Sequence, residues 1–253
     1  MTDRNTVFLQ EMGLGPLWRQ RPPAVDPTEV PQGDQAAESP IEVLPSAAPT
    51  PIAESAGLSV SAMNWAQLKA AVAACRQCGL CEKRTNTVFG VGDEQAKWLF
   101  IGEGPGRNED KQGEPFVGPA GKLLDNMLLA LGLKRGANAY IANIVKCRPT
   151  DPGGKDRPPE AIEADACMPF LDRQIALIQP SIIVALGKTA ALSLLKLDPA
   201  TPVSSLRGKV HRYGNLPLVV TYHPAYLLRN LPDKRKSWDD LCLAMRIYAD
   251  ASA

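Results

Sequence analysis

Six cysteines in 253 residues constrain the fold of this chain more than any other feature. Cys75 and Cys78 form a Cys-x-x-Cys pair in a polar segment, whereas Cys147 and Cys167 come from two later segments. Thiols that remain reduced can meet at one metal centre, and thiolates suit zinc or an iron–sulfur cluster. Cys242 lies in an apolar run and fits a small buried hydrophobic residue instead. A shared centre would require these distant segments to come together in the fold.

The N-terminal quarter has a composition of its own. Residues 1–59 carry three basic and eight acidic residues, a net charge of −5, whereas residues 60–253 carry 25 basic and 19 acidic residues, a net charge of +6. Residues 22–58 are rich in Pro, Ala, Ser and acidic residues, which predicts a disordered linker. Residues 1–21 contain an apolar cluster between Phe8 and Trp18, which indicates a short docking peptide. The alternative, that this peptide packs loosely on its own domain, stays open.

After residue 58, short apolar runs alternate with stretches of helical spacing. The candidate strands are Trp98–Ile101, Ala139–Val145, Ser181–Leu186 and Leu216–Thr221. The candidate helices are residues 61–74, Ala120–Leu131, Pro159–Ile178, Lys188–Leu195 and Ser237–Tyr248. This alternation predicts a three-layer α/β/α domain over residues 59–253, with a mainly parallel central sheet of roughly four strands.

Glycine-rich or polar segments follow or close three of these strands. The segment Gly102–Gly106 follows the first, Asn143 lies near the end of the second, and His223 follows the last. Ligands of such sheets bind at the carboxyl ends of the strands, so we expect these residues to meet there. Singly, each has a plain structural interpretation: a turn with a solvated Glu103, an amide bonded to its own backbone, a structural histidine. Phe116, in a Gly- and Pro-bounded loop, could stack on a flat base or belong to the core.

Taken in order, these segments resemble the family-4 uracil-DNA glycosylases, the bacterial and archaeal iron–sulfur branch of their superfamily. The matching segments are Cys75-x-x-Cys78, Gly102-Glu-Gly-Pro-Gly106, Pro115-Phe-Val-Gly118, Asn143-Ile-Val-Lys-Cys147-Arg-Pro, Cys167 and His223-Pro. The resemblance covers roughly residues 75–248. It implies an enzyme that flips uracil out of DNA and hydrolyses its N-glycosidic bond, which leaves an abasic site for base excision repair.

The resemblance also implies a structural [4Fe–4S] cluster, ligated by Cys75, Cys78, Cys147 and Cys167. Cys81 keeps the ligand set open. It extends the first pair to a Cys-x-x-Cys-x-x-Cys run that imitates a ferredoxin spacing, so it could replace one of the four.

A role for each matched crevice residue follows from the same resemblance. Gly102, Phe116 and Asn143 would bind uracil, Phe116 by stacking and Asn143 by hydrogen bonds that reject cytosine. His223 would stabilise negative charge on the departing uracil. Glu103 would position water or stabilise the oxocarbenium-like sugar. The segment of residues 149–159 contains no histidine, so we expect ordinary hydrolytic turnover rather than a covalent product.

Contacts with DNA are expected in the last third of the chain. Leu227 and Leu228 could wedge into the gap left by the flipped base, and Arg229 and Arg207 could hold phosphates. Ala225 stands where the family commonly has Ser, so no role is assigned to a hydroxyl group there.

Two other classes of function are compatible with the sequence. One is a non-catalytic iron–sulfur module that binds nucleic acid or senses redox state, and the other is an electron-transfer protein. Residues 5–20 could bind a replication or repair protein. The chain lacks an apolar run long enough for a membrane span and starts without a signal-peptide pattern, so we expect it in the bacterial cytoplasm. We also expect it to be a monomer and to associate with the nucleoid.

Overall fold

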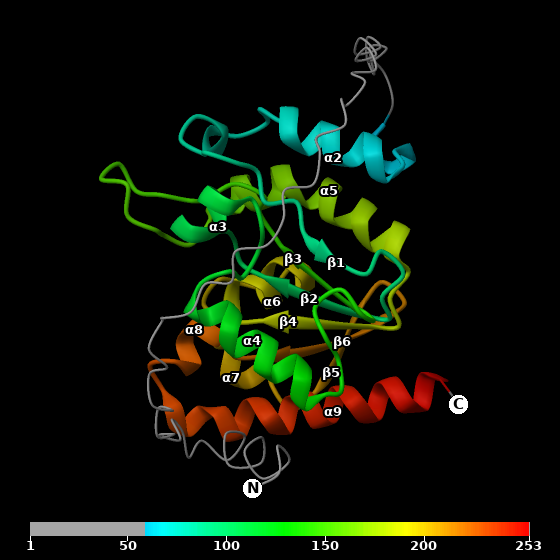
Figure 1. The fold of residues 1–253 in the computed structure, drawn as a ribbon. Helices are drawn as coiled ribbons and strands as arrows, with labels where there is room; N and C mark the ends of the chain where they lie inside the picture. The colour runs from blue at the N-terminus through cyan, green and yellow to red at the C-terminus, as the bar shows by residue number, and fades with distance from the viewer. Residues whose placement is uncertain (1–58, 253) are drawn as a thin grey trace, which may run out of the picture. The chain divides into compact units, whose positions relative to one another are not determined.

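A six-stranded sheet forms the centre of residues 59–252, the part of the chain that the computed structural model describes (Figure 1). The strands lie in the order β1-β3-β2-β4-β6-β5. They are β1 (Val91–Gly92), β2 (Trp98–Gly102), β3 (Ala139–Asn143), β4 (Ile182–Leu186), β5 (Val210–Tyr213) and β6 (Leu216–Thr221). The predicted docking peptide and linker, residues 1–58, lie outside the described residues.

The four predicted strands correspond to β2, β3, β4 and β6, which pair parallel to one another. The mixed α/β class and the mainly parallel sheet are thus confirmed. The expected strand number was too low, because β1 and β5 add antiparallel edges. Strand β1 has only two residues, and β5 alternates between exposed and partly buried side chains, so neither has the continuous apolar run by which the central strands were recognised.

Helices cover both faces of this sheet. On one side lie α5 (Ala161–Ile178) and α6 (Lys188–Leu195), and on the other lie α4 (Pro119–Ala130) and α9 (Lys234–Ser252). Short helices complete the domain: η1 (Val60–Ala62), α2 (Trp65–Ala74), η2 (Gly79–Cys81), α3 (Arg107–Gln112), α7 (Val203–Leu206), α8 (Pro224–Leu227) and η3 (Leu231–Asp233). Most predicted helix bounds agree within a few residues. Residues 61–74 divide into η1 and α2.

Alternation along the strands separates two hydrophobic cores. In β2, Leu99 and Ile101 face the core shared with α5 and α6, whereas Trp98 and Phe100 face the core shared with α4 and α9. All five residues of β2, β3 and β4 are buried, as parallel strands covered on both faces require. A third, smaller cluster packs α2 against the outer side of α5 through Leu68, Val72 and Phe170 (Figure 1).

The strand register decides what meets at the carboxyl edge. Gly102 pairs with Asn143, and Leu186 pairs with Thr221. The residues that follow β2, β4 and β6 therefore leave the sheet side by side, where ligands of such folds bind. No helix within residues 59–252 has both the length and the apolar character that a bilayer span needs.

Candidate active site

Three of the predicted uracil-binding residues are in close contact at the carboxyl ends of β2 and β3. A Cβ atom added to Gly102 would lie 2.5 Å from Asn143 Oδ1 and 2.6 Å from Phe116 Cζ. Neither distance is compatible with a real side chain. Glycine is therefore required here by the close approach of the Phe116 ring and the Asn143 amide, and not by backbone conformation.

Asn143 is 2% exposed and closes β3. Its side-chain oxygen Oδ1 is buried and has no hydrogen-bond partner among the described residues. Buried polar atoms in folded proteins are nearly always paired, so an orphaned acceptor in a crevice indicates a donor that a ligand supplies. The N3–H group of a pyrimidine such as uracil is a donor of this kind.

His223 lies beside Phe116, with ring centroids 5.5 Å apart and an interplanar angle of 27°. The backbone N–H of Ala225 donates to His223 Nδ1 over 3.1 Å. Since Nδ1 accepts, the proton of the neutral ring is on Nε2. Burial, reinforced by the positive charge of Arg229, lowers the pKa of His223 to about 4. The ring is thus a neutral donor at physiological pH.

Gly187 leaves room for this histidine. It follows β4 with φ +94°, and an added Cβ would lie 2.8 Å from His223 Cβ. Both the positive φ and the close approach require glycine. Nothing in the sequence pattern identified Gly187 as a partner of His223, because the contact joins the ends of two different strands.

Glu103 continues from β2 into the same crevice. Its carboxylate accepts a hydrogen bond of 2.5 Å from the Thr189 hydroxyl group, on the first turn of α6. Burial raises the pKa of Glu103, and the Thr189 hydrogen bond opposes that rise. Sequence reasoning selected Glu103 but missed Thr189, which belongs to no motif of its own.

The loop that carries Phe116 is held from several sides. Phe116 has φ +55°, and a Cβ on Gly121 would lie 1.6 Å from the Phe116 carbonyl oxygen. Arg135 donates to the carbonyl oxygens of Pro115 and Phe116, each over 2.9 Å, and Glu109 accepts from the two backbone N–H groups that follow Phe116, at 3.0 and 3.1 Å. The loop presents the ring as a fixed wall of the crevice.

The four cysteines of the predicted cluster gather beside the core between the sheet and α5. Cys147 and Cys167 are buried, whereas Cys75 and Cys78 are partly buried. Cys78 interacts electrostatically with the other three thiols, and Cys167 also interacts with Cys75. Cys81 interacts with Cys78 as well, so its part in the ligand set stays undecided. Distant segments of the chain thus meet as a shared centre requires.

The chemistry of this donor set, four thiols, is the one that an iron–sulfur cluster takes. Across residues 59–252, no three His, Cys, Asp or Glu side chains converge closely enough to hold one metal ion. A [4Fe–4S] cluster takes its thiolates at separate iron corners, so its ligands surround a volume rather than a point. Arg84 donates to Cys147 Sγ over 3.2 Å and to the Cys75 carbonyl oxygen over 2.9 Å. This cation would offset part of the negative charge of a thiolate cluster.

The predicted DNA contacts have different environments. Leu228 is 41% exposed just after α8, whereas Leu227 is 1% exposed and belongs to the packed interior. Arg229 is exposed. Arg207, in contrast, is held by Asp240 at 2.7 Å and lies over the Tyr222 ring at 4.2 Å. Leu228 and Arg229 are therefore exposed, whereas Arg207 makes contacts within the domain.

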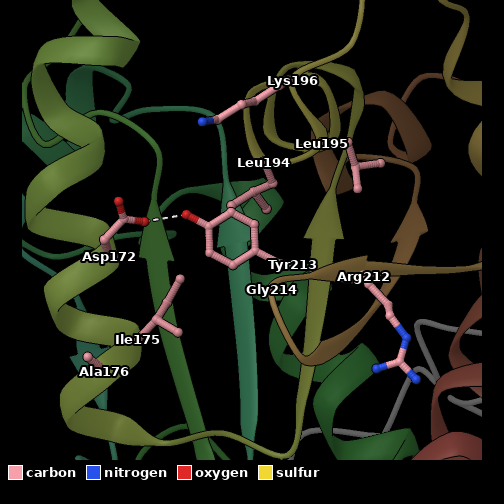
Figure 2. Close-up of a pocket in the computed structure, with 9 residues that line it drawn as sticks. All are labelled: Asp172, Ile175, Ala176, Leu194, Leu195, Lys196, Arg212, Tyr213 and Gly214. Carbon is pink, nitrogen blue, oxygen red and sulfur yellow. Dashed lines mark hydrogen bonds between the residues drawn. The ribbon is translucent and has the colours of Figure 1, made fainter.

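A cavity of about 540 Å³ lies elsewhere, between α5, α6 and the β5–β6 turn (Figure 2). Figure 2 shows Tyr213 hydrogen-bonded to Asp172 among the residues that line this cavity. Tyr213 pairs with the first residue of β6, so this cavity lies toward the amino ends of the parallel strands. It contains none of the predicted site residues, and the crevice is assigned on its chemistry rather than on volume.

Comparison with known proteins agrees with this geometry. The model of the uracil DNA glycosylase superfamily matches residues 89–242. A type-4 uracil-DNA glycosylase of Archaeoglobus fulgidus is 43% identical over 174 residues, which cover 66% of this chain and 84% of the relative. One from Sulfurisphaera tokodaii is 44% identical over 177 residues, 67% of this chain and 78% of the relative. A type-5 uracil-DNA glycosylase of Pyrobaculum aerophilum is 29% identical over 150 residues, 54% of this chain and 64% of the relative.

The chain belongs to the type-4 uracil-DNA glycosylases. The family resemblance inferred from the motifs is therefore confirmed. The superfamily model begins at residue 89, after the first cysteine pair, and ends at residue 242 within α9. Within this type-4 chain, the residues that sequence reasoning missed are those that hold the motif residues in place: Thr189, Gly187, Gly121, Glu109 and Arg135.

Proposed function

We propose that the crevice at the carboxyl ends of β2, β3 and β6 binds an extruded uracil and is the place where its N-glycosidic bond is hydrolysed. The protein is a monofunctional uracil-DNA glycosylase, a DNA-repair hydrolase that leaves an abasic site. The observation that carries the assignment of the site is the orphaned Asn143 Oδ1, which lies with the Phe116 ring against Gly102, while a neutral His223 lies against that ring.

Recognition rests on stacking and on one base edge. The Phe116 ring offers a flat surface to the base, and Asn143 Oδ1 accepts from the N3–H group of uracil. Cytosine has an unprotonated N3 and an exocyclic amine, so its pattern of donors and acceptors is reversed at this edge.

Bond cleavage leaves negative charge on the departing uracil. His223 Nε2–H is a neutral donor that can stabilise this charge by a hydrogen bond. Fixed donors aimed at developing charge are the most effective form of such stabilisation. Glu103, fixed by Thr189, orients the attacking water or stabilises the positive charge on the sugar.

Cys75, Cys78, Cys147 and Cys167 would hold a [4Fe–4S] cluster. When bound, it would supply a crosslink between the segment after α2, the segment after β3 and the helix α5, and no redox step. Cys147 lies four residues after Asn143, so the crosslink would anchor the chain just behind the uracil-binding edge.

DNA would be engaged beside α8. Leu228 is the exposed apolar residue that can enter the gap left by the flipped base, and Arg229 can hold a phosphate. Leu227 would support the wedge from within the fold, and Arg207 would support α9 through Asp240. The enzyme would act as a monomer in the cytoplasm, near the nucleoid, and residues 5–20 would bind a replication or repair protein.

The test is single-turnover excision of uracil from a short duplex, with enzyme in excess, which separates chemistry from DNA affinity. Asn143→Asp should lower the rate by about 10²–10³, because a carboxylate lacks the side-chain NH₂ group with which Asn143 would donate to uracil O4. Wild-type-like rates in this variant would remove the crevice assignment, whereas a wild type that excises no uracil would favour a module that only binds nucleic acid. The electron-transfer and binding-module alternatives gain no support from the type-4 relatives described above, which are named as glycosylases.

A further inference from the structure

Lys146 is the most deeply buried cation of the site region, with 1% of its surface exposed. It lies three residues after Asn143, between the crevice and Cys147. Its Nζ atom donates to the backbone carbonyl oxygen of Asn143 over 2.9 Å and to Gln174 Oε1 over 2.6 Å. Neither of these acceptors is charged, and neither Lys146 nor Gln174 has been given a role in the chemistry proposed above.

The first hydrogen bond fixes the main chain of the uracil-reading residue. Beyond β3, the N–H groups of Ile144 and Val145 donate to the carbonyl oxygens of Gly102 and Glu103, at 2.9 and 3.2 Å. The ladder between the two strands thus continues past Asn143. The Asn143 carbonyl is held by the ammonium group of Lys146 rather than by the neighbouring strand. Both sides of this peptide unit are therefore restrained.

The second hydrogen bond extends this restraint to a helix. Gln174 lies on α5, is fully buried, and donates from Nε2 to the Phe89 carbonyl oxygen over 2.9 Å. Phe89 precedes β1. A continuous chain of hydrogen bonds therefore runs from the Asn143 carbonyl through Lys146 and Gln174 to the backbone at residue 89. Three separate segments fix the position of one ammonium group.

A charge in this place needs an explanation beyond packing. Burying an ammonium group away from water is unfavourable unless hydrogen bonds compensate it, and a methionine of similar length would fill the volume without that cost. What an apolar side chain cannot do is hold the Asn143 carbonyl. The side-chain amide of Asn143, with its unpaired Oδ1, is carried by that same backbone, so a shift of the backbone moves the atom assigned to the uracil edge.

We propose that Lys146 is a positioning residue for uracil recognition, which acts on the base only through Asn143. The proposal rests on the assignment of Asn143 as the residue that binds the uracil edge. Gln174 holds the ammonium group from the opposite side and sets where its hydrogen bond to Asn143 points. Lys146 itself touches neither the base nor the sugar.

A double-mutant cycle separates positioning from general stability. Single-turnover excision of uracil is measured for wild type, Lys146→Met, Asn143→Ala and the double variant, at a temperature where circular dichroism shows each to be folded. Lys146→Met should lower the rate by about 10², as a displaced recognition group does. In the Asn143→Ala background, where the target of positioning is gone, Lys146→Met should change the rate by no more than about twofold.

The outcomes distinguish the possible failures. Equal losses from Lys146→Met in both backgrounds would show an effect on the fold as a whole and overturn the proposal. An unchanged rate in Lys146→Met would also overturn it. An unchanged rate in Asn143→Ala would instead remove the assignment of Asn143. Should Lys146→Met not fold, Gln174→Met replaces it in the same cycle: we expect a smaller loss that again vanishes when Asn143 is absent, and a loss that persists there overturns the proposal.

Discussion

The Thr189 hydroxyl group donates a hydrogen bond of 2.5 Å to the Glu103 carboxylate and so joins the first turn of α6 to the end of β2. Burial alone would favour the neutral acid, and this donor favours the charged form. The two effects oppose each other in the group that we propose positions water or stabilises the developing cation. Thr189 therefore controls how acidic Glu103 remains.

Thr189→Val should shift the acidic limb of the pH–rate profile to higher pH. The substitution keeps the shape of the side chain but removes the donor, so the pKa of Glu103 rises further above its usual value. If the carboxylate acts in its charged form, activity is lost as the pH falls through that pKa, and the loss begins earlier in the variant. Thr189→Ser retains the donor and serves as control. Superimposable profiles for wild type and Thr189→Val would refute this role.

His223 should remain neutral throughout the working range. Its pKa of about 4 lies below the ordinary value of 6.5, so the unfolded chain binds the proton more tightly than the folded protein. Folding stability from this group is present above about pH 6.5 and is lost as the pH falls toward 4. Nitrogen NMR of labelled histidine should show an Nε2–H tautomer at pH 7, with Nδ1 unprotonated.

His223→Ala should lower single-turnover excision by about 10²–10³, because the donor to the departing base is lost. His211 provides a matched control, since its Nε2 contacts the Leu206 carbonyl oxygen away from the crevice. A titration of His223 near pH 6.5, or excision unaffected by its loss, would contradict the assignment.

Arg135→Met should release the Phe116 loop. The variant loses the hydrogen bonds to the carbonyl oxygens of Pro115 and Phe116 and the ion pair with Asp125. We expect weaker binding of an uncleavable uracil substrate and slower excision, with unchanged affinity for DNA that lacks uracil. Lys134→Met, at the exposed neighbouring position, is the control. An equal loss of affinity for both kinds of DNA would point to a phosphate contact instead.

The purified protein should be brown and contain about four iron and four sulfide per chain. Cys147→Ser and Cys167→Ser should bleach and destabilise it, and Cys242→Ser should not. Cys81→Ser decides the ligand set: bleaching as severe as in Cys75→Ser would bring Cys81 into it. Stoichiometric zinc in a colourless protein would exclude the cluster.

Deletion of residues 1–58 should leave excision from short oligonucleotides within a few-fold of the full-length rate. All residues assigned to the crevice and to the cysteine centre lie after that segment, and its removal takes away a charge of −5 (three basic against eight acidic residues). Affinity for DNA should therefore be equal or slightly higher. A loss of activity in this truncation would show that the segment packs on the catalytic domain.

The sequence predicted those parts of the fold and site that leave a local pattern. Buried parallel strands appear as apolar runs, which is why β2, β3, β4 and β6 were found, and glycine-rich or polar residues at their ends marked the crevice. The edge strand β1 could not be found in this way, because two residues carry no period.

The supporting residues could not be predicted for a different reason. Thr189, Arg135 and Gln174 act through contacts with residues 19 to 86 positions away in the chain. Their side chains are ordinary for the helices and loops that carry them. Leu227 and Leu228 show the same limit, since adjacent identical residues differ in exposure only because α8 turns one of them inward.

The pairing of Gly102 with Asn143 links the enzyme's competence to its folding. A slip of one residue between β2 and β3 would turn the Asn143 side chain to the opposite face of the sheet and remove it from the proposed uracil site. Correct pairing of these two strands thus also places Asn143 beside Gly102, where it is proposed to bind uracil. Since this part of the site is built on a buried sheet, we expect it to be rigid before any substrate binds. The DNA rather than the protein then has to deform, and a base that unstacks easily enters the site most often.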